Sequence, residues 1–166
     1  MSDPEGFTVG VTIARKRIGG AWPSEEWRPR AVLAMAPATP PWTVLEESES
    51  ETLFYAGSAF VALERGSTPH YGDNLVGTVP SLWVVLQPDG EGVAILDVTV
   101  DPYEGEGYME GMDTIVEAVP MPPQVAAWVQ DFYDRCHVET IFVKRERDKP
   151  ELDVFGRRQR NGQDDR

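Results

Sequence analysis

Residues 82–100, LWVVLQPDGEGVAILDVTV, decide the fold class of this chain. Two runs of residues that favour strands, 82–86 and 93–100, flank Pro88-Asp89-Gly90. Each of these three residue types favours a tight turn for its own reason, since proline presets φ, aspartate bonds nearby backbone and glycine tolerates positive φ. The stretch therefore predicts a β-hairpin, and the two-residue period of a strand places four side chains of the second arm on one face: Ala94, Leu96, Val98 and Val100.

Further strands are predicted on both sides of this hairpin. Residues 7–13 alternate apolar and small or polar side chains, the pattern of a half-buried strand. A second strand, 31–35, follows the segment Trp27-Arg28-Pro29-Arg30, and prolines at 37, 40 and 41 then form a rigid connector. We also expect a second hairpin, with arms 53–56 and 59–63 around Gly57-Ser58, a long loop over 66–80 and a short closing strand over 114–119.

One helix is predicted near the end of the chain, over residues 122–136. It begins at Pro122-Pro123, because proline is tolerated in a first helical turn. Its apolar residues recur at three- and four-residue spacing, which gives one stripe that faces a core: Val125, Trp128, Val129, Phe132 and Cys136.

The order of these elements predicts a mainly β protein. Six to seven strands followed by one helix favour a small antiparallel barrel or sandwich with the C-terminal helix packed on it. A pleckstrin-homology-like arrangement shares this order. We expect one β-rich domain over residues 1–143 and a charged, flexible tail over 144–166.

The charge distribution favours a basic or metal-bearing partner and argues against nucleic acid. The net charge of the 166 residues is −13, and between Arg30 and Arg135 seventeen Asp and Glu face one basic residue, Arg65. Such a field governs association and solubility. Nucleic acid is excluded as a partner, because phosphate contacts need a basic face. An acidic body instead suits a basic or metal-bearing partner.

Motifs that do not occur in the sequence limit the cellular compartment and the reaction types that we expect for this protein. The single cysteine, Cys136, excludes an internal disulfide framework and any multi-cysteine metal site. The first residues carry no signal-peptide pattern, and the longest apolar run, 31–36, is too short to cross a bilayer. We expect a cytoplasmic protein without membrane contact. The common nucleotide-loop, nucleophile-elbow and zinc-protease motifs do not occur, so no catalytic, cofactor-binding or metal-binding residue is predicted.

Two groups of residues are candidates for contact with a partner. The segment 101–113 holds the densest acids, but their spacing does not match a calcium-binding EF-hand loop. It is predicted to be a solvated acidic turn with local helix over 103–109 that can serve as a docking surface. Tryptophan is enriched at the centres of protein interfaces. The predicted partner-binding residues are Trp27, Trp42, Glu104, Glu106 and Glu110.

Several segments resemble an uncharacterised bacterial family. They are Trp27-Arg28-Pro29, Pro41-Trp42-Thr43-Val44-Leu45, Val119-Pro120-Met121-Pro122-Pro123 with Ala127-Trp128-Val129, and Phe142-Val143-Lys144-Arg145. The resemblance covers roughly residues 7–158, and the proline-rich segment before the helix is its most specific part. Members carry a domain-of-unknown-function label, and their genes tend to lie near those of molybdenum-dependent formate dehydrogenases and their maturation factors.

This resemblance implies a function that the residues alone do not. We expect a non-catalytic accessory or assembly protein that binds a molybdenum-dependent formate dehydrogenase component or its maturation machinery. Some members are labelled molybdopterin-guanine dinucleotide biosynthesis protein A, which implies an enzyme that handles a guanine nucleotide on a parallel sheet. Gly19-Gly20 is followed by Ala21-Trp22-Pro23 and not by a phosphate-binding loop, so this chain departs from that pattern. A peptide-binding module of pleckstrin-homology type is the remaining alternative.

Overall fold

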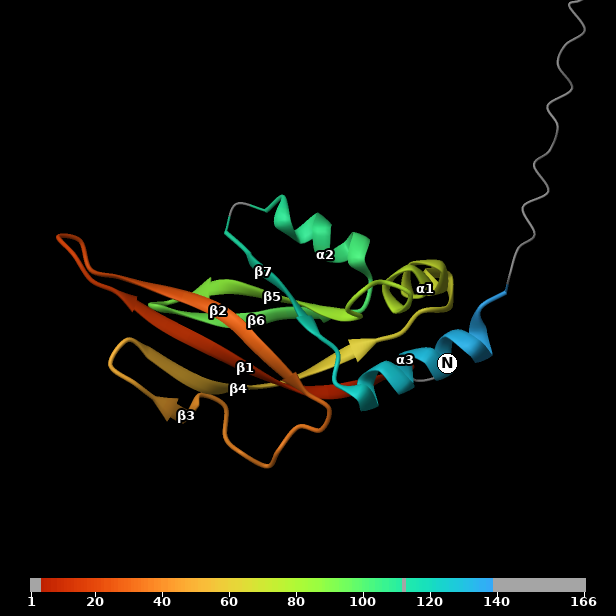
Figure 1. The fold of residues 1–166 in the computed structure, drawn as a ribbon, viewed down its shortest axis with the longest axis horizontal. Helices are drawn as coiled ribbons and strands as arrows, with labels where there is room; N and C mark the ends of the chain where they lie inside the picture. The colour runs from red at the N-terminus through yellow and green to blue at the C-terminus, as the bar shows by residue number, and fades with distance from the viewer. Residues whose placement is uncertain (1–3, 112, 139–166) are drawn as a thin grey trace, which may run out of the picture.

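The computed structural model describes residues 4–111 and 113–138. The predicted tail, 144–166, lies outside the described residues. Four strands come first along the chain, and the last three strands are preceded, interrupted and followed by helices (Figure 1). The elements in chain order are β1 (Gly6–Ile18), β2 (Ser24–Leu33), β3 (Thr43–Glu47), β4 (Glu51–Ala62), a 3₁₀ turn (Arg65–Ser67), α1 (Thr68–Leu75), β5 (Ser81–Asp89), β6 (Gly92–Thr99), α2 (Pro102–Met109), β7 (Ile115–Pro120) and α3 (Pro123–Cys136).

Two antiparallel sheets pack face to face, so the predicted fold class is confirmed in its sandwich form. One sheet has the strand order β2-β1-β4-β3 and the other has the order β6-β5-β7. The sheets approach one another where β2 meets β7 and where β4 meets β6, but they do not close into a barrel. The hairpin predicted from residues 82–100 is confirmed as β5 and β6. The closing strand is confirmed as β7, which pairs with β5.

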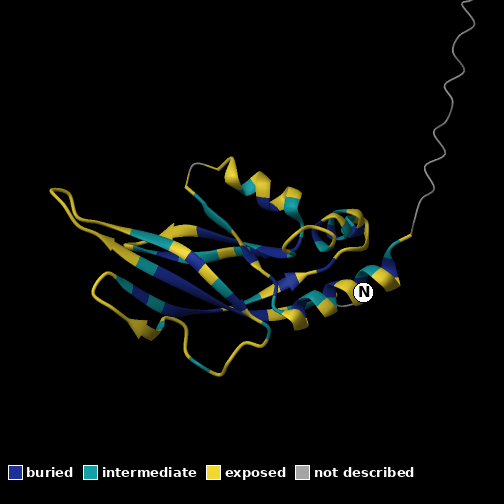
Figure 2. Ribbon diagram, viewed as in Figure 1, coloured by how far each residue is buried: buried dark blue, intermediate teal, exposed yellow. Residues whose placement is uncertain are grey.

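The core lies between the sheets and continues under α3 (Figure 2). Alternate residues of the central strands β1 and β5 point into it, as a two-residue period requires. The helix predicted over 122–136 is confirmed as α3, and its apolar stripe covers one end of the core. The most completely buried side chains include Val9, Val11 and Ile13 of β1, Leu82, Val84 and Leu86 of β5, and Val125, Val129 and Phe132 of α3.

The second predicted hairpin is wrong. Residues 51–62 form one continuous strand, β4, which pairs with β1 along its whole length. Gly57 has φ = 126° and lies beside a register shift between Val11 and Thr12 of β1. Glycine accepts this backbone conformation without a steric penalty, so here it absorbs a strand irregularity and does not make a turn.

Two further predictions need correction. The segment 66–80, expected to be a loop, contains α1, in which Tyr71 and Asn74 are buried. The predicted common face of the β6 arm is interrupted, because the β5–β6 register shifts between Val85 and Leu86. Leu96 is consequently 41% exposed, whereas Val98 and Val100 are buried. A bulge of this kind turns the side chains that follow it to the other face of the strand.

Strand β3 was not expected after the prolines, yet it forms the outer edge of the four-stranded sheet. Its residues 43–47 pair with β4, and the register shifts between Val44 and Glu46, so that Leu45 is the extra residue of a bulge. Figure 2 shows most of this strand as exposed. Bulges and acidic side chains on an edge strand are known protections against unspecific strand pairing.

Candidate functional site

An aromatic cluster forms beside the β3 edge. The rings of Trp27 and Trp42 meet almost at right angles, with centroids 5.9 Å apart, and Phe54 lies 5.9 Å from Trp27 and 5.7 Å from Trp42. Such tilted and stacked contacts are favourable beyond the area that they bury. The structure therefore brings together two of the predicted partner-binding residues, Trp27 and Trp42.

The proline-rich connector places Trp42 in an unusual backbone conformation. Trp42 has φ = 68°, the left-handed region that large L-residues rarely adopt. Its N–H donates to the carbonyl of Tyr55 at 2.5 Å, and the hydroxyl of Thr43 donates to the carbonyl of Pro40 at 2.7 Å. Strain of about 1–3 kcal/mol persists only where the surroundings impose it, and it often marks functional sites.

Arg15 of β1 supports this cluster from the neighbouring strand. Its guanidinium carbon lies 5.8 Å from the ring centroid of Trp27 and 5.2 Å from that of Phe54. The buried Nε of Arg15 has no hydrogen-bond partner among the described residues, and the carboxylate of Glu25 is 3.6 Å away. The guanidinium therefore lies within cation–π distance of two of the rings, and its attraction to them helps to fix their orientation.

The exposed part of this region is a short apolar strip that we call the β3 ledge, defined as Trp42, Val44 and Leu45. The exposed fractions of these side chains are 38%, 49% and 49%. Sequence analysis identified Trp42 and missed Val44 and Leu45, because the prolines argued against a strand there. The signal for them was Thr43-Val44-Leu45 itself, a β-branched and apolar run.

The other three predicted residues, Glu104, Glu106 and Glu110, lie on a different part of the molecule. They are exposed on α2 or at its C-terminal end. This helix packs on β5 and β7 of the three-stranded sheet, far from β3 in Figure 1. Its Gly105 lies so close to the ring of Trp83 that a Cβ there would be 2.3 Å from Cγ. The structure therefore separates the two predicted groups.

Hydrogen bonds fix the first turn of α2. Asp101 caps the helix, because its Oδ1 accepts from the backbone N–H groups of Tyr103 and Glu104. The other carboxylate oxygen of Asp101 is 2.8 Å from Nδ1 of His70 on α1. The hydroxyl of Tyr103 donates to Asp73, and this bond raises the pKa of the Tyr103 phenol. Residues 101–109 of the acidic segment thus form a capped helix that is joined to α1.

The carboxylates around α2 do not form a metal centre in the described ranges 4–111 and 113–138, where no group of three or more His, Cys, Asp and Glu is placed to hold an ion. A pocket of about 170 Å³ beside β4 and β6 is nevertheless lined by four carboxylates. One of them, Asp97, accepts a hydrogen bond of 2.8 Å from the hydroxyl of Tyr108. This bond, with burial as a smaller cause, raises the pKa of Tyr108 to about 12.

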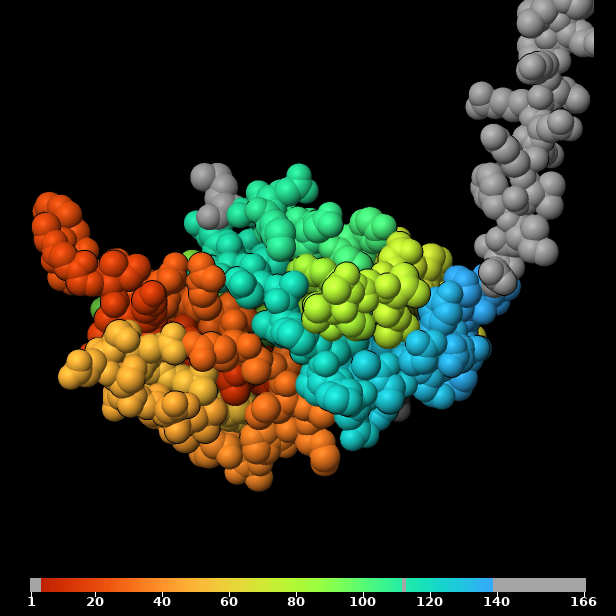
Figure 3. All heavy atoms as spheres, viewed as in Figure 1, coloured from red at the N-terminus to blue at the C-terminus, as the bar shows by residue number. Residues whose placement is uncertain are grey.

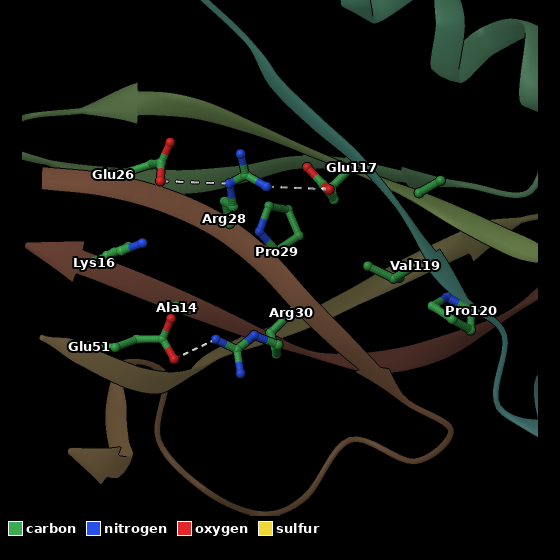
Figure 4. Close-up of a pocket in the computed structure, with 11 residues that line it drawn as sticks. Ala14, Lys16, Glu26, Arg28, Pro29, Arg30, Glu51, Glu117, Val119 and Pro120 are labelled. Atoms are coloured by element: carbon green, nitrogen blue, oxygen red, sulfur yellow. Dashed lines mark hydrogen bonds and ion pairs between the residues drawn. The ribbon is translucent and has the colours of Figure 1, made fainter. Parts of the chain in front are cut away.

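A second pocket, of about 280 Å³, lies where β2 meets β7 (Figure 4). Its basic side chains come from β1 and β2: Lys16, Arg28 and Arg30. Three acids face them: Glu26, Glu51 and Glu117. The Arg30 Nη2 and Glu51 Oε1 atoms are 2.5 Å apart, whereas Arg28 lies 3.8 Å from Glu26 and 4.0 Å from Glu117. Because the pocket holds equal numbers of opposite charges, it does not attract an anion strongly. Its ion pairs instead link neighbouring strands, and the pair between Arg28 and Glu117 links the two sheets.

Sequence analysis did not anticipate this charged pocket. Glu26, Arg28 and Arg30 recur every second residue and lie on the outer face of β2. That period was the available signal. Trp27 and Pro29 alternate with these charged residues and give the strand an apolar pattern on its other face. The register of β1 against β2 and β4 then places Lys16 opposite both Glu26 and Glu51.

The fold and these surfaces define a small two-sheet β protein with an acidic body, a C-terminal helix and an apolar strip on one sheet edge. The chain belongs to the family described as Protein of unknown function (DUF3305), whose model matches residues 8–147. The predicted resemblance is confirmed at the level of an uncharacterised domain family. Searches among curated proteins and among solved structures gave no match. None of the described helices is both long and apolar enough to cross a membrane.

Proposed function

We propose that this chain is a non-catalytic accessory protein that binds its partner through the β3 ledge. The partner class is a subunit or maturation factor of a molybdenum-dependent formate dehydrogenase. The gene neighbourhood of the family that the sequence resembles supports this partner. The observation that carries the binding role is the exposure of Trp42, Val44 and Leu45, three apolar side chains within four consecutive positions at the start of β3, the edge strand of the four-stranded sheet among the described residues.

Burial of the ledge supplies the affinity. Removing apolar surface from water contributes roughly 25 cal/mol per Å², and tryptophan is frequent among the residues that dominate binding energy. The contacts of Trp42 with Trp27 and Phe54 hold it in place before a partner arrives. A fixed side chain loses little conformational freedom on binding, which favours a tighter complex.

The acids contribute to the rate of encounter and to specificity. Glu46 and Glu47 follow the ledge directly along β3, so a partner segment with basic residues beside its apolar ones is complementary to it. Glu104 and Glu106 on α2 belong to the same negative field but not to the ledge. Association should consequently slow as the salt concentration rises, because salt screens long-range attraction more than it weakens apolar contact.

The experiment compares three versions of the full-length chain as affinity baits in cells that produce the formate dehydrogenase. They are the wild type, Leu45→Asp on the ledge and the matched control Leu96→Asp on β6. The two leucines have similar exposed fractions, 49% and 41%, so both variants should fold. We expect wild type and Leu96→Asp to recover a formate dehydrogenase component, and Leu45→Asp to recover roughly tenfold less.

Two results would contradict the proposal. The partner is wrong if the wild type recovers no formate dehydrogenase component or maturation factor at low salt. The ledge is wrong if the Leu45→Asp and Leu96→Asp variants recover the component equally. Calorimetry with GTP and Mg²⁺ tests the cofactor-biosynthesis alternative, for which micromolar binding would replace our proposal. The described strands pair antiparallel, in contrast to the parallel sheet expected for that enzyme.

A further inference from the structure

Strand β3 differs from the other edge strands of the two sheets. The edges are β2 and β3 in the four-stranded sheet and β6 and β7 in the three-stranded sheet. Strand β2 lies against β7, and β6 lies against β4, so each of these three edges has the opposite sheet beside it. In the described ranges 4–111 and 113–138, β3 packs on β4, and Figure 3 shows the hairpin that joins these two strands at the molecular surface. Among the described residues, β3 is therefore the edge that can accept an added strand.

The backbone and the side chains of β3 can both take part in such binding. The backbone groups of successive strand residues point alternately to the two sides of the strand, so pairing with β4 leaves about half of those of β3 directed away from the sheet. Beside them, Val44 and Leu45 are each 49% exposed, and the acids Glu46 and Glu47 follow. In strand addition, main-chain hydrogen bonds supply affinity and the neighbouring side chains supply specificity.

Glu46 and Glu47 are not held in ion pairs within the described part of the chain. The ion pairs found there use other carboxylates. Arg30, which lines a small pocket together with Glu46, pairs with Glu51. Glu46 and Glu47 lie opposite consecutive residues of β4, so they point to opposite faces of the sheet. A strand added beside β3 therefore meets one carboxylate on each face, at two consecutive positions.

The charge of this edge selects the kind of strand that can pair with it. A bulge and charged residues discourage unspecific pairing at a sheet edge, but a charge repels only strands of its own sign. Opposite charges that face each other across two strands stabilise the pair, whereas like charges destabilise it. A second copy of this chain brings the same acids and its own net charge of −13, which disfavours self-pairing. The edge therefore favours a basic strand from another protein.

We propose that the partner adds a strand antiparallel to β3, through an extended segment in which two consecutive basic residues precede two apolar ones. The partner occupies the β3 ledge in this way, so the proposal rests on the proposed function. In antiparallel order, the basic pair lies beside Glu47 and Glu46, and the apolar pair lies beside Leu45 and Val44. The antiparallel direction agrees with all strand pairs of the described sheets and with the greater stability of antiparallel pairing. The four-stranded sheet thereby gains a fifth strand.

The test uses a blocked hexapeptide, acetyl-Thr-Lys-Lys-Val-Ile-Thr-amide, which is titrated into the full-length chain and followed by two-dimensional NMR. Two further versions carry N-methyl groups, one on the first, third and fifth residues and the other on the second, fourth and sixth. In a paired strand, the N–H groups of one set point toward β3 and those of the other set point away. We expect one methylated version to bind within about threefold of the unmodified peptide and the other to bind at least roughly tenfold more weakly. The side chains are identical in both versions, so this preference identifies backbone pairing.

Charge reversal tests the recognition of the basic residues. Glu46→Lys changes the edge, and Glu106→Lys on α2 is the matched control, because both glutamates are exposed and both changes replace one negative charge by one positive charge. We expect Glu46→Lys to weaken binding of the unmodified peptide roughly fivefold and Glu106→Lys to change it less than about twofold. Amide hydrogens of β3 should exchange with solvent more slowly in the complex than in the free protein.

Three outcomes would overturn the proposal: no binding of the unmodified peptide at low salt, equal affinities of the two methylated versions, or equal affinities of the two charge variants. Slow exchange of the β3 amides that occurs without peptide and increases with protein concentration would instead assign the edge to a second copy. These measurements contain no formate dehydrogenase component. Strand addition can therefore be refuted while the affinity-bait experiment succeeds, and the reverse result refutes the partner while strand addition stands.

Discussion

Replacement of Asn74 by alanine should destabilise the protein strongly, because this one side chain joins α1 to both ends of the β5–β6 hairpin. The amide Nδ2 donates to the carbonyls of Ser81 and Val100, at 2.8 and 2.9 Å. The amide Oδ1 accepts from the N–H of Ser81 at 3.0 Å. Asn74 is 6% exposed, so water does not replace these bonds easily.

The size of the effect follows from the groups left without partners. Two carbonyls and one N–H would lose their hydrogen bonds in a buried place, and each such group costs about 1–3 kcal/mol. Partial relaxation reduces the sum, so we expect the free energy of unfolding to fall by about 3–5 kcal/mol. With a urea dependence of about 2 kcal/mol per molar, the midpoint should fall by about 1.5–2.5 M.

The assay is urea unfolding followed by tryptophan fluorescence and circular dichroism. Gln130→Ala is the matched control, because Gln130 is an exposed helical amide with a single side-chain bond, to Asp134. That variant should change the midpoint by less than about 0.3 M. If Asn74→Ala unfolds within about 1 kcal/mol of wild type, then the three hydrogen bonds do not hold α1 as argued.

Two further predictions concern α2 and its neighbours. Gly105→Ala should destabilise the protein by about 1–3 kcal/mol, because the new Cβ would meet the Trp83 ring. Gly107→Ala has open space around the new Cβ and should stabilise the protein by up to about 1 kcal/mol. Thermal unfolding of the two variants compares these effects. The raised pKa of Tyr108, about 12 against the ordinary 10.0, means that its bond to Asp97 stabilises the fold fully below pH 10 and is lost as the pH rises through 12. Tyr108→Phe should flatten this pH dependence in urea unfolding, and an unchanged dependence would contradict the assignment.

The sequence pattern predicts an element correctly where the local turn or helix signal agrees with the burial of its apolar residues. Gly90, with φ = 63°, lies in the turn of the β5–β6 hairpin, whereas Pro88 and Asp89 still belong to β5 and pair with Val93 and Gly92, so the predicted turn is correct in its place along the chain but shorter than expected. The apolar stripe of α3 specifies a helix by its spacing. Gly57-Ser58 failed as a turn signal, because the same residue types also permit a strand irregularity. Whether a glycine turns the chain or bends a strand depends on the strand that pairs with it.

Contacts between distant parts of the chain stabilise α1 and β3, the two elements that the local sequence pattern does not predict. Helix α1 is short and carries Pro69 and Gly72, which weaken its local signal. The buried Asn74 compensates by bonding to Ser81 of β5 and to Val100, the residue that follows β6. Strand β3 follows three prolines and depends on pairing with β4. Neither dependence is visible from residues that lie next to one another in the chain.

The candidate site was only half predictable for the same reason. Residue type identified Trp27 and Trp42, and the structure places them in one cluster. Residue type also identified Glu104 and Glu106, but it gave no information on distance, and the fold puts α2 on the other sheet. Charge density along a sequence therefore predicts an acidic field and not a common surface.

The most direct test of the central claim is a binding isotherm between the purified full-length chain and the purified formate dehydrogenase component. It should be measured for wild type, Leu45→Asp and Leu96→Asp, the ledge variant and its control. We predict saturable binding that Leu45→Asp weakens roughly tenfold and that Leu96→Asp leaves unchanged. Equal affinities for the two variants would contradict the β3 ledge as the binding surface, and no binding by wild type at low salt would contradict the accessory role itself.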